Sequence, residues 1–169
     1  MVMFVVEGEK DTYRNVAAVG EFVVNLVSVS LARAMELTAV DFPAEIDEAT
    51  WAHLHWGPAA RVCPPRVTEA NAAMECVVEQ IVHIGTSNHM IIGKVLHYFV
   101  RHDVIAGNRV DPLRLDPLGR IGGGYVEIGA AFKLSRPTAA SALAEGVGSA
   151  LNLVVRTELG KRCSQPTDT

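Results

Sequence analysis

Cysteine and long apolar runs are both scarce in this sequence. Its three cysteines, Cys63, Cys76 and Cys163, are widely spaced and form no Cys-x-x-Cys pair. We expect reduced, structural thiols, because free cysteine is usually buried. No apolar run approaches the roughly 20 residues that a membrane helix needs, and the first residues, MVMFVVEGEKD, are too few and too acidic for a signal peptide. These absences predict a cytoplasmic protein that does not enter a membrane.

An excess of basic residues is also absent. Lysine and arginine number 15 against 19 aspartate and glutamate residues, for a formal net charge of −4, which gives no reason to expect a nucleic-acid partner. Hydrophobic residues make up 49% of the chain and charged residues 20%, a balance typical of a globular protein. At 169 residues the chain is long enough to bury a core without a disulfide or a metal.

The first part of the chain is predicted to alternate strands and helices. The strands cover residues 2–6 and 21–28, and the helices cover residues 13–19 and 31–39. Either Asp11 or Thr12 is expected to cap the first helix, which Gly20 ends, and Ser30 is expected to cap the second. Residues 40–67 contain four prolines and predict a long loop with one short helix near 45–54, of the kind that is usually functional or covers an interface.

A long hairpin is predicted over residues 73–104, with a turn at 85–88. Strict alternation in its first strand places two sets of residues on opposite faces: Met74, Cys76, Val78 and Val82 against Glu75, Val77, Glu79 and Ile81. Residues 110–124 are predicted as a loop and residues 125–137 as a last strand. The sequence therefore predicts a mainly β, mostly antiparallel fold with flanking helices.

Composition changes after Pro137. Leu143, Val147, Leu151 and Val154 recur at helical spacing, and the last residues, KRCSQPTDT, are polar. This pattern predicts a helix followed by a frayed tail. We therefore expect a domain at residues 1–137 and a C-terminal extension at residues 138–169.

Lys10 stands in front of the first predicted helix, where the partial positive charge of the helix terminus disfavours a cation. One interpretation is a solvated cap, in which Glu9 and Asp11 neutralise the lysine. The other is an anion site, in which the first-turn amides, the Thr12 hydroxyl and the Lys10 ammonium converge on a phosphate. The local pattern leaves both open.

The segment GRIGGGY, residues 119–125, is not a dinucleotide fingerprint, because it precedes a predicted strand and opens no helix. Its glycines allow the backbone to approach a flat ligand or another subunit, with Arg120 placed to contact an anion. A flexible turn with a surface arginine is the alternative.

Histidines give no clear catalytic or metal signature. His53 and His55 have no carboxylate or third histidine at ligand spacing, so no metal site is expected. His97, between Val95 and Phe99 on an inward face, is interpreted as a hydrogen-bonded core residue, with a role as acid or base as the alternative. No Ser-His-Asp order or nucleophile elbow is present.

Five segments occur in the order seen in flavin reductase-like proteins: KDTYRNVAAVGEFVVNLVS, EIDEATWAHL, PPRVTEANAAMECVV, IIGKVLHYFV and VDPLRLDPLGRIGGGYVEI. The chain resembles that family over residues 4–137. The most specific parts are the Lys-Asp-Thr-x-x-Asn segment with GEFVVN, the Glu-Cys pair at 75–76, and the segment from Arg120 to Tyr125.

This resemblance implies an FMN-binding split β-barrel that works as a homodimer and transfers hydride from NADH or NADPH to flavin, with a monooxygenase as a further partner. By likeness, Lys10, Asp11 and Thr12 match the segment beside the FMN phosphate. His97, Arg120 and Tyr125 match positions near the flavin or nicotinamide. Because the cofactor performs hydride transfer, no single catalytic side chain is expected.

Family members carry further strands before the Lys-Asp-Thr segment. We expect either a reading frame that begins upstream of Met1, or a shortened relative whose barrel is completed by residues 138–169 or by a partner. The alternative to an enzyme is a non-catalytic flavin-binding module, or an incomplete barrel that is active only in an assembly.

Overall fold

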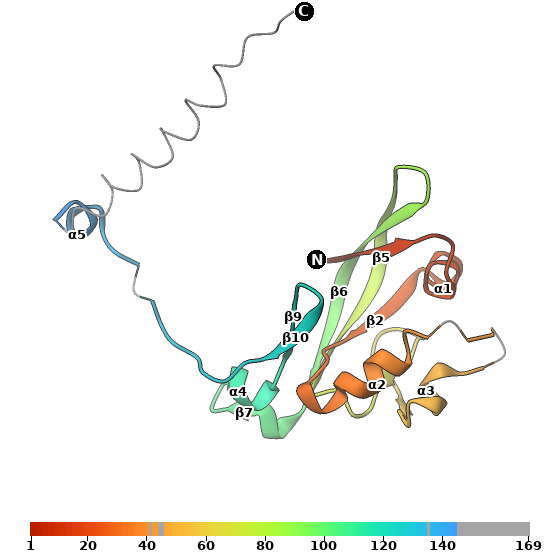
Figure 1. Cartoon of the computed structure of the whole chain (residues 1–169), viewed down its shortest axis with the longest axis horizontal. Helices are drawn as coiled ribbons and strands as arrows, with labels where there is room; N and C mark the ends of the chain where they lie inside the picture. The colour runs from red at the N-terminus through yellow and green to blue at the C-terminus, as the bar shows by residue number, and fades with distance from the viewer. Residues whose placement is uncertain (41, 44–45, 135, 145–169) are drawn as a thin grey trace, which may run out of the picture. The chain divides into compact units, whose positions relative to one another are not determined.

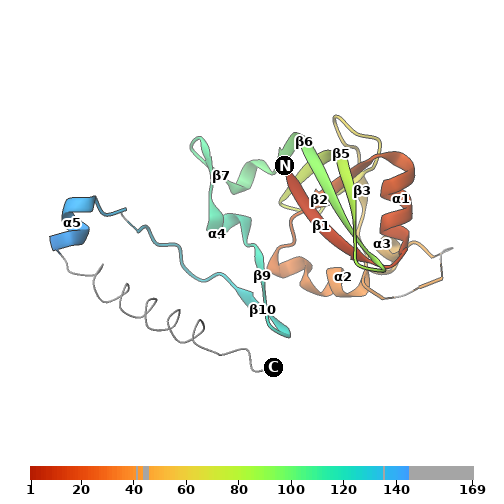
Figure 2. The ribbon, with the colours of Figure 1, turned by 90° about the horizontal axis from the view of Figure 1, so that it is seen from above.

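Four antiparallel strands form the main sheet, in the order β1–β6–β5–β2. The computed structural model describes residues 1–40, 42–43, 46–134 and 136–144. The four strands lie side by side, and β5 and β6 form the long curved hairpin of Figures 1 and 2. Their bounds are β1 Val2–Glu7, β2 Glu21–Asn25, β5 Ala72–Ile84 and β6 Asn88–Val100. The predicted strands and hairpin are confirmed, and β1 and β2 are the outer strands of this sheet.

Helix α1, Asp11–Val19, connects β1 to β2 and ends at Gly20, whose φ of 75° is the left-handed conformation that glycine adopts readily. The predicted cap by Asp11 or Thr12 is wrong, since both lie inside the helix. Lys10 occupies the N-cap position with an extended backbone, and its side chain makes no capping hydrogen bond. The Asp11 carboxylate instead pairs with Arg14 one turn along.

The second helix is preceded by a turn that was not predicted. A 3-10 turn, η1 Val29–Leu31, leads into α2, Ala32–Leu37. Ser30 lies inside this turn, and its hydroxyl is 2.8 Å from that of Ser28, so the prediction that Ser30 caps the helix is wrong. The short helix in the proline-rich loop is confirmed as α3, Glu48–Trp51. Asp47 caps it by accepting from the amide of Ala49, and the Thr50 hydroxyl lowers the pKa of Asp47.

One face of the sheet packs against α1. Its core consists of Val6, Val16, Phe22, Cys76 and Ile91. Strict alternation fails at two β-bulges, between Glu75 and Cys76 and between Val78 and Gln80. The second bulge moves Ile81, paired with Ile91, onto this core face and Val82 off it, contrary to prediction.

Three short ribbons and two short helical segments complete the first part of the chain. The ribbons pair β3 Trp56–Gly57 with β4 Arg66–Val67, β7 Ile105–Ala106 with β8 Arg109–Val110, and β9 Leu118–Ile121 with β10 Gly124–Glu127. The helical segments are η2 His102–Val104 and α4 Pro112–Leu115.

The last predicted strand is shorter than expected. The strand within residues 125–137 is β10, which ends at Glu127, opposite Leu118, the first residue of β9. Pro117, just before β9, has no backbone N–H to donate, so the ladder stops there. The predicted loop at 110–124 contains α4 and β9.

The chain divides into two compact units, residues 1–131 and 132–169. In the second unit the described helix is α5, Ala139–Ala144, which includes the first position of the predicted helical repeat. Val147, Leu151 and Val154 lie outside the described residues. Within the described chain, no helix has the length and apolar character needed to span a bilayer.

Candidate functional site

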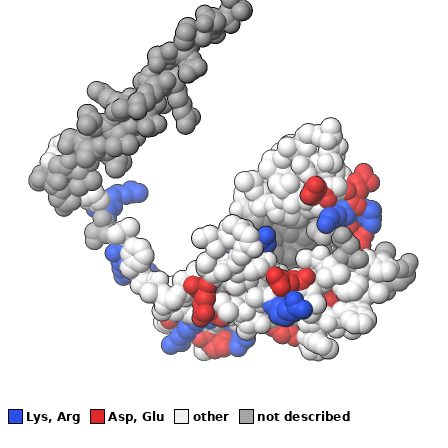
Figure 3. Space-filling view, viewed as in Figure 1, with Lys and Arg blue, Asp and Glu red and all other residues white. Residues whose placement is uncertain are grey.

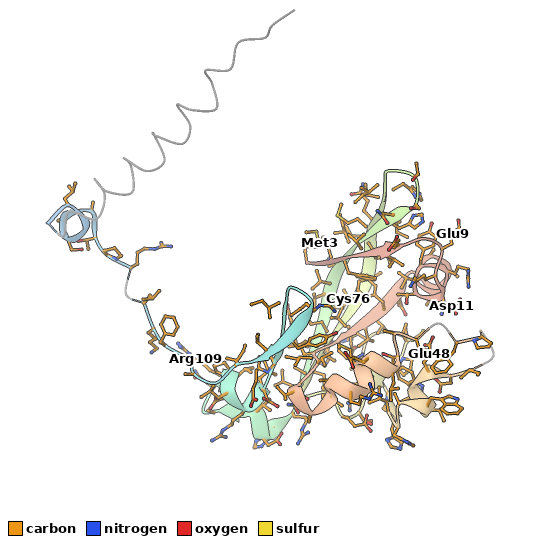
Figure 4. All side chains as sticks on the ribbon, viewed as in Figure 1. Met3, Glu9, Asp11, Glu48, Cys76 and Arg109 are labelled. Carbon is orange, nitrogen blue, oxygen red and sulfur yellow. The ribbon has the colours of Figure 1, made fainter. Side chains whose placement is uncertain are left out.

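The start of α1 faces a cavity of about 480 Å³, which we term the α1 cavity. It is lined on one side by Lys10, Asp11, Thr12, Arg14 and Asn15, and on the other by residues 38–40, Phe42 and Glu48. Figure 4 shows Asp11 on α1 and Glu48 on α3 near each other at this place. The three residues of the predicted phosphate segment therefore do line one cavity.

Charges in the α1 cavity are mixed. Arg14 is engaged with the Asp11 carboxylate and donates to the backbone oxygen of Glu9 at 2.5 Å. Acidic and basic side chains are likewise intermixed beside each other on the face shown in Figure 3. Among the described residues that line the cavity, Lys10 and Glu48 also carry formal charges.

The N-terminus of α1 has donor groups of the kind that an anion site uses. The first N–H groups of a helix have no partner within the helix. The side chain of the N-cap residue, Lys10, makes no capping hydrogen bond to them. The first amide to donate within the helix is that of Arg14, to the Lys10 oxygen. Inward N–H groups and the helix dipole both favour negative charge at this end. The Lys10 side chain and the Thr12 hydroxyl lie at the same cavity.

A second cavity of about 590 Å³ runs along the outer edge of β2, between α1 and the loop that precedes β4. We term it the β2-edge cavity. Thr12 and Asn15 line both cavities, so the two cavities adjoin at the first half of α1. The opposite wall consists of Trp56, Cys63, Pro64 and Pro65.

A buried carboxylate holds the loop that forms this wall. Glu75 is 1% exposed, and its two oxygens accept from the amide of Ala60, each at 3.0 Å. One oxygen also accepts from the amide of Arg61 at 2.6 Å. Alternation had placed Glu75 on a polar outer face. The signal that could have indicated its role was an acidic residue in the otherwise apolar first half of the strand, AAMECVV.

Two residues of β2 hold the next part of the loop. Glu21 accepts from the amide of Cys63 at 2.8 Å, and the Asn25 side chain accepts from the amide of Val67 at 3.0 Å. Glu21 and Asn25 alternate with Phe22 along the strand and share a face with Glu75 through the β2–β5 register. The sheet face opposite α1 is thus a row of acceptors for loop amides. Sequence reasoning missed all three acceptors.

His97 lies on this loop-facing side, directly opposite Glu75 in the β5–β6 register, and is half-buried. The predicted grouping with Val95 is wrong, because the bulge pairs Val95 with Cys76 on the core face. Phe99 shares the side of His97, and the Arg66 guanidinium lies 3.7 Å from the centre of its ring. His97 therefore lies on the side of the sheet that faces the proline-rich loop, and it is not among the residues that line the α1 cavity.

Arg120 and Tyr125 face each other across the β9–β10 ribbon. The Arg120 guanidinium donates to the Tyr125 hydroxyl at 3.0 Å. Gly122, with a φ of 50°, forms the turn between the two strands. The structure brings these two predicted residues together, and neither belongs to the residues that line the α1 cavity or the β2-edge cavity.

The two described cysteines differ in exposure. Cys76 is fully buried, and burial raises the pKa of its thiol, which disfavours the reactive thiolate. Cys63 is exposed, and both cysteines are free thiols. Cys163 lies outside the described residues. Within those residues, no three histidine, cysteine or acidic side chains are grouped as a metal site would require, and His55 instead pairs with Glu69 at 2.6 Å.

The order of motifs and the curled sheet point to one family. A model of the flavin reductase like domain matches residues 1–129. The chain belongs to the flavin reductase-like family. The resemblance predicted from the sequence is confirmed, whereas the domain boundary after residue 137 stays a prediction.

Curated relatives of this flavin reductase-like chain include two uncharacterised bacterial proteins. One, from Deinococcus radiodurans, is 40% identical over 134 residues, which are 76% of this chain and 59% of that protein. The other, from Halalkalibacterium halodurans, is 34% identical over 135 residues, 76% of this chain and 65% of that protein. The chain thus spans less than two thirds of the length of either relative.

Solved structures agree on the fold. Nitrilotriacetate monooxygenase component B from Bacillus cereus matches with a TM-score of 0.73 at 30% identity, covering 78% of this chain and 70% of that one. The 2-nitrobenzoate 2-nitroreductase from Pseudomonas fluorescens matches with a TM-score of 0.74 at 29% identity, covering 81% of this chain and 69% of that one. The predicted split β-barrel is confirmed.

Proposed function

We propose that this protein is an FMN-dependent oxidoreductase of the NAD(P)H:flavin reductase type. The observation that carries the proposal is the N-terminus of α1, where Lys10 makes no side-chain capping hydrogen bond and, with Thr12, lines a cavity that adjoins the β2-edge cavity. Family membership supports flavin as the ligand. Cytoplasmic location and a homodimer remain predictions that accompany this proposal.

The residues at the start of α1 fit a phosphate group. The first-turn amides, the Thr12 hydroxyl and the Lys10 ammonium supply donors, and the Asp11 charge is balanced by Arg14. Glu48 adds a negative charge on the far wall, which opposes any anion that does not lie close to α1. We therefore assign the phosphate to the α1 side of the cavity.

Bound FMN would supply the redox chemistry, because a flavin ring accepts hydride from a reduced nicotinamide. The protein's own part is binding and orientation. Thr12 and Asn15 join the phosphate end of the site to the β2-edge cavity, and the segment from Cys63 to Pro65 closes the far side. His97, Arg120 and Tyr125 stay proposals for neighbours of the flavin or nicotinamide.

The similar structures suggest where the electrons go. One is named as a component of a monooxygenase and the other as a nitroreductase. We propose that reduced flavin formed here serves an oxygenase partner, with direct reduction of a small acceptor as the variant of the same chemistry. Either NADH or NADPH is the donor.

A second candidate is a flavin-binding module that works only in an assembly. The observation in its favour is the apolar face of β1, where Met3 is 71% and Val5 57% exposed. Large exposed apolar surface typically marks an interaction site. In this case flavin binds, but the isolated chain does not turn over.

The test is an FMN titration of the purified chain by quenching of flavin fluorescence, followed by NADH and NADPH oxidation with FMN present. Saturable binding with oxidation of either nucleotide supports the reductase. Binding without oxidation supports the assembly-dependent module, and absence of binding contradicts both.

Replacing Lys10 with glutamate sharpens the test. The variant Lys10→Glu places a like charge beside the phosphate and is expected to weaken FMN binding at least about tenfold, with little effect on the unfolding midpoint. Lys94→Glu, an exposed site on β6, is the matched control and should bind FMN normally. Equal FMN affinity in Lys10→Glu and the parent protein would return Lys10 to the interpretation of a solvated cap.

A further inference from the structure

The loop of residues 58–65 has an unusual attachment to the sheet. A segment that contains Pro64 and Pro65 lacks two backbone donors and cannot pair as a strand along β2. Its amides instead donate to side chains that rise from the sheet, the first of them Glu75. The position of this loop is therefore set by side-chain acceptors, not by a backbone ladder.

We propose that Glu75 is a positioning residue for the ring end of the flavin site. It holds the amides of Ala60 and Arg61, and so fixes the segment whose Cys63, Pro64 and Pro65 form the far wall of the β2-edge cavity. This inference rests on the proposed function, and it assigns to Glu75 a role that involves no contact with the cofactor.

The chemistry of Glu75 suits this role. Hydrogen bonds from amides to a carboxylate are stronger and more directional than those between neutral groups. Both oxygens are engaged, at 3.0 Å to Ala60 and 2.6 Å to Arg61, and the residue is 1% exposed. Burial of a carboxylate is costly unless such bonds satisfy it. A carboxylate held this tightly defines the distance between β5 and the loop more narrowly than apolar contact does.

The wall is also fixed further along the loop, by a more exposed contact. Glu21 on β2 accepts from the amide of Cys63 at 2.8 Å. Loss of Glu75 therefore releases the segment at Ala60 and Arg61 while Cys63 stays attached. Glu75 accepts from the amides of Ala60 and Arg61, whereas Lys10 and Thr12 lie at the start of α1 and line the α1 cavity. The two ends of the site can thus be perturbed separately.

The experiment compares Glu75→Gln with Glu79→Gln, an exposed position on the same strand. In Glu75→Gln a side-chain NH2 replaces one acceptor oxygen and meets loop N–H groups donor to donor. Amide hydrogen exchange is measured by NMR on flavin-free protein. We expect exchange at Ala60 and Arg61 to rise about tenfold in Glu75→Gln, with β6 amides unchanged and Glu79→Gln like the parent protein.

Flavin binding supplies the second readout. In Glu75→Gln, riboflavin and FMN should both bind about tenfold more weakly, so that their affinity ratio is unchanged, because the ring end is affected. In Lys10→Glu only FMN should weaken, because riboflavin has no phosphate. If Glu75→Gln does not fold, Glu21→Gln tests the same wall through Cys63 and should show a smaller effect in the same direction.

The outcomes separate the two proposals. Faster exchange at Ala60 and Arg61 with unchanged flavin affinity overturns the positioning role, as does unchanged exchange. If the unaltered chain takes up no flavin, the proposed function fails and the positioning role falls with it, while the exchange data still show whether Glu75 holds the loop. Weaker flavin binding with an unchanged affinity ratio and faster exchange supports the inference.

Discussion

The two faces of the main sheet are both covered, but by different chemistry. Toward α1 the buried side chains are apolar, with Phe22 at 6% and Ile91 at 0% exposure. Toward the proline-rich loop, β5 buries a carboxylate, Glu75, which is 1% exposed. Burial alone therefore does not distinguish the faces. The apolar face contributes stability without direction, whereas the polar face contributes directional bonds that set where a loop lies.

The largest expected effect of a substitution lies on the apolar face. Phe22 packs edge-on against Phe4, with ring centres 5.3 Å apart, and belongs to the core with Val16 and Cys76. Phe22→Ala removes a buried ring and leaves a cavity, which should lower the free energy of unfolding by about 3–5 kcal/mol. Urea unfolding measures the loss. Phe132→Ala, at a position 82% exposed, is the control, and a loss below about 1 kcal/mol in Phe22→Ala would contradict this account of the core.

Overpacking the same face should cost less. A Cβ at Gly93 on β6 would lie 2.3 Å from a ring carbon of Phe22, so the ring must move. We expect Gly93→Ala to lower the free energy of unfolding by about 1–3 kcal/mol. Gly129→Ala, where nothing lies within 4 Å of the added carbon, controls for the general effect of the substitution. Equal thermal midpoints for the two variants would show that Phe22 adapts without cost.

Sequence patterns predicted the apolar face except at the second bulge, where Ile81 takes the place predicted for Val82. The β5–β6 hairpin has the alternation and glycine-marked turn that specify register, and Gly20 ended α1 as expected. Helix caps were predicted poorly, because several adjacent polar residues compete for one N-cap position. Lys10, which is not a preferred cap, occupies that position in α1.

The loop-facing side could not be read from the pattern. A β-bulge inserts one residue into a strand, so the side chains after it lie on the opposite face from the one that alternation predicts. Neither Glu79 nor its sequence neighbours indicate that a bulge occurs there. Glu75 looked like an outward residue because its partners, the amides of Ala60 and Arg61, lie some 15 residues away in a loop without periodicity. For the candidate site, Lys10 to Thr12 were predicted together and line the α1 cavity, whereas the wall opposite β2 was not predicted.

The smallest expected effect lies at the exposed end of the loop layer. Glu69 accepts from the backbone amide of His55 at 3.2 Å, and its other oxygen is 2.6 Å from the His55 ring. Partial burial acts to raise the pKa of Glu69, but the hydrogen bonds from His55 outweigh it and lower the pKa to about 2. Both groups are substantially exposed to solvent, so the contribution to stability is small.

Because the pKa of Glu69 is lower in the folded protein than its ordinary value of 4.5, its contribution is present above that value. It is lost as the pH falls from about 4.5 toward 2. We therefore expect the free energy of unfolding to fall less steeply over this interval in Glu69→Gln than in the parent protein, by less than about 1 kcal/mol. Near neutrality we expect no effect of pH from this site. Urea unfolding at several pH values measures the difference, with Glu79→Gln as control. If Glu69→Gln and the parent protein lose stability in parallel, the contact with His55 positions the end of the loop without stabilising the fold. The loop-facing side of the sheet then only determines where the loop lies, even at this ion pair.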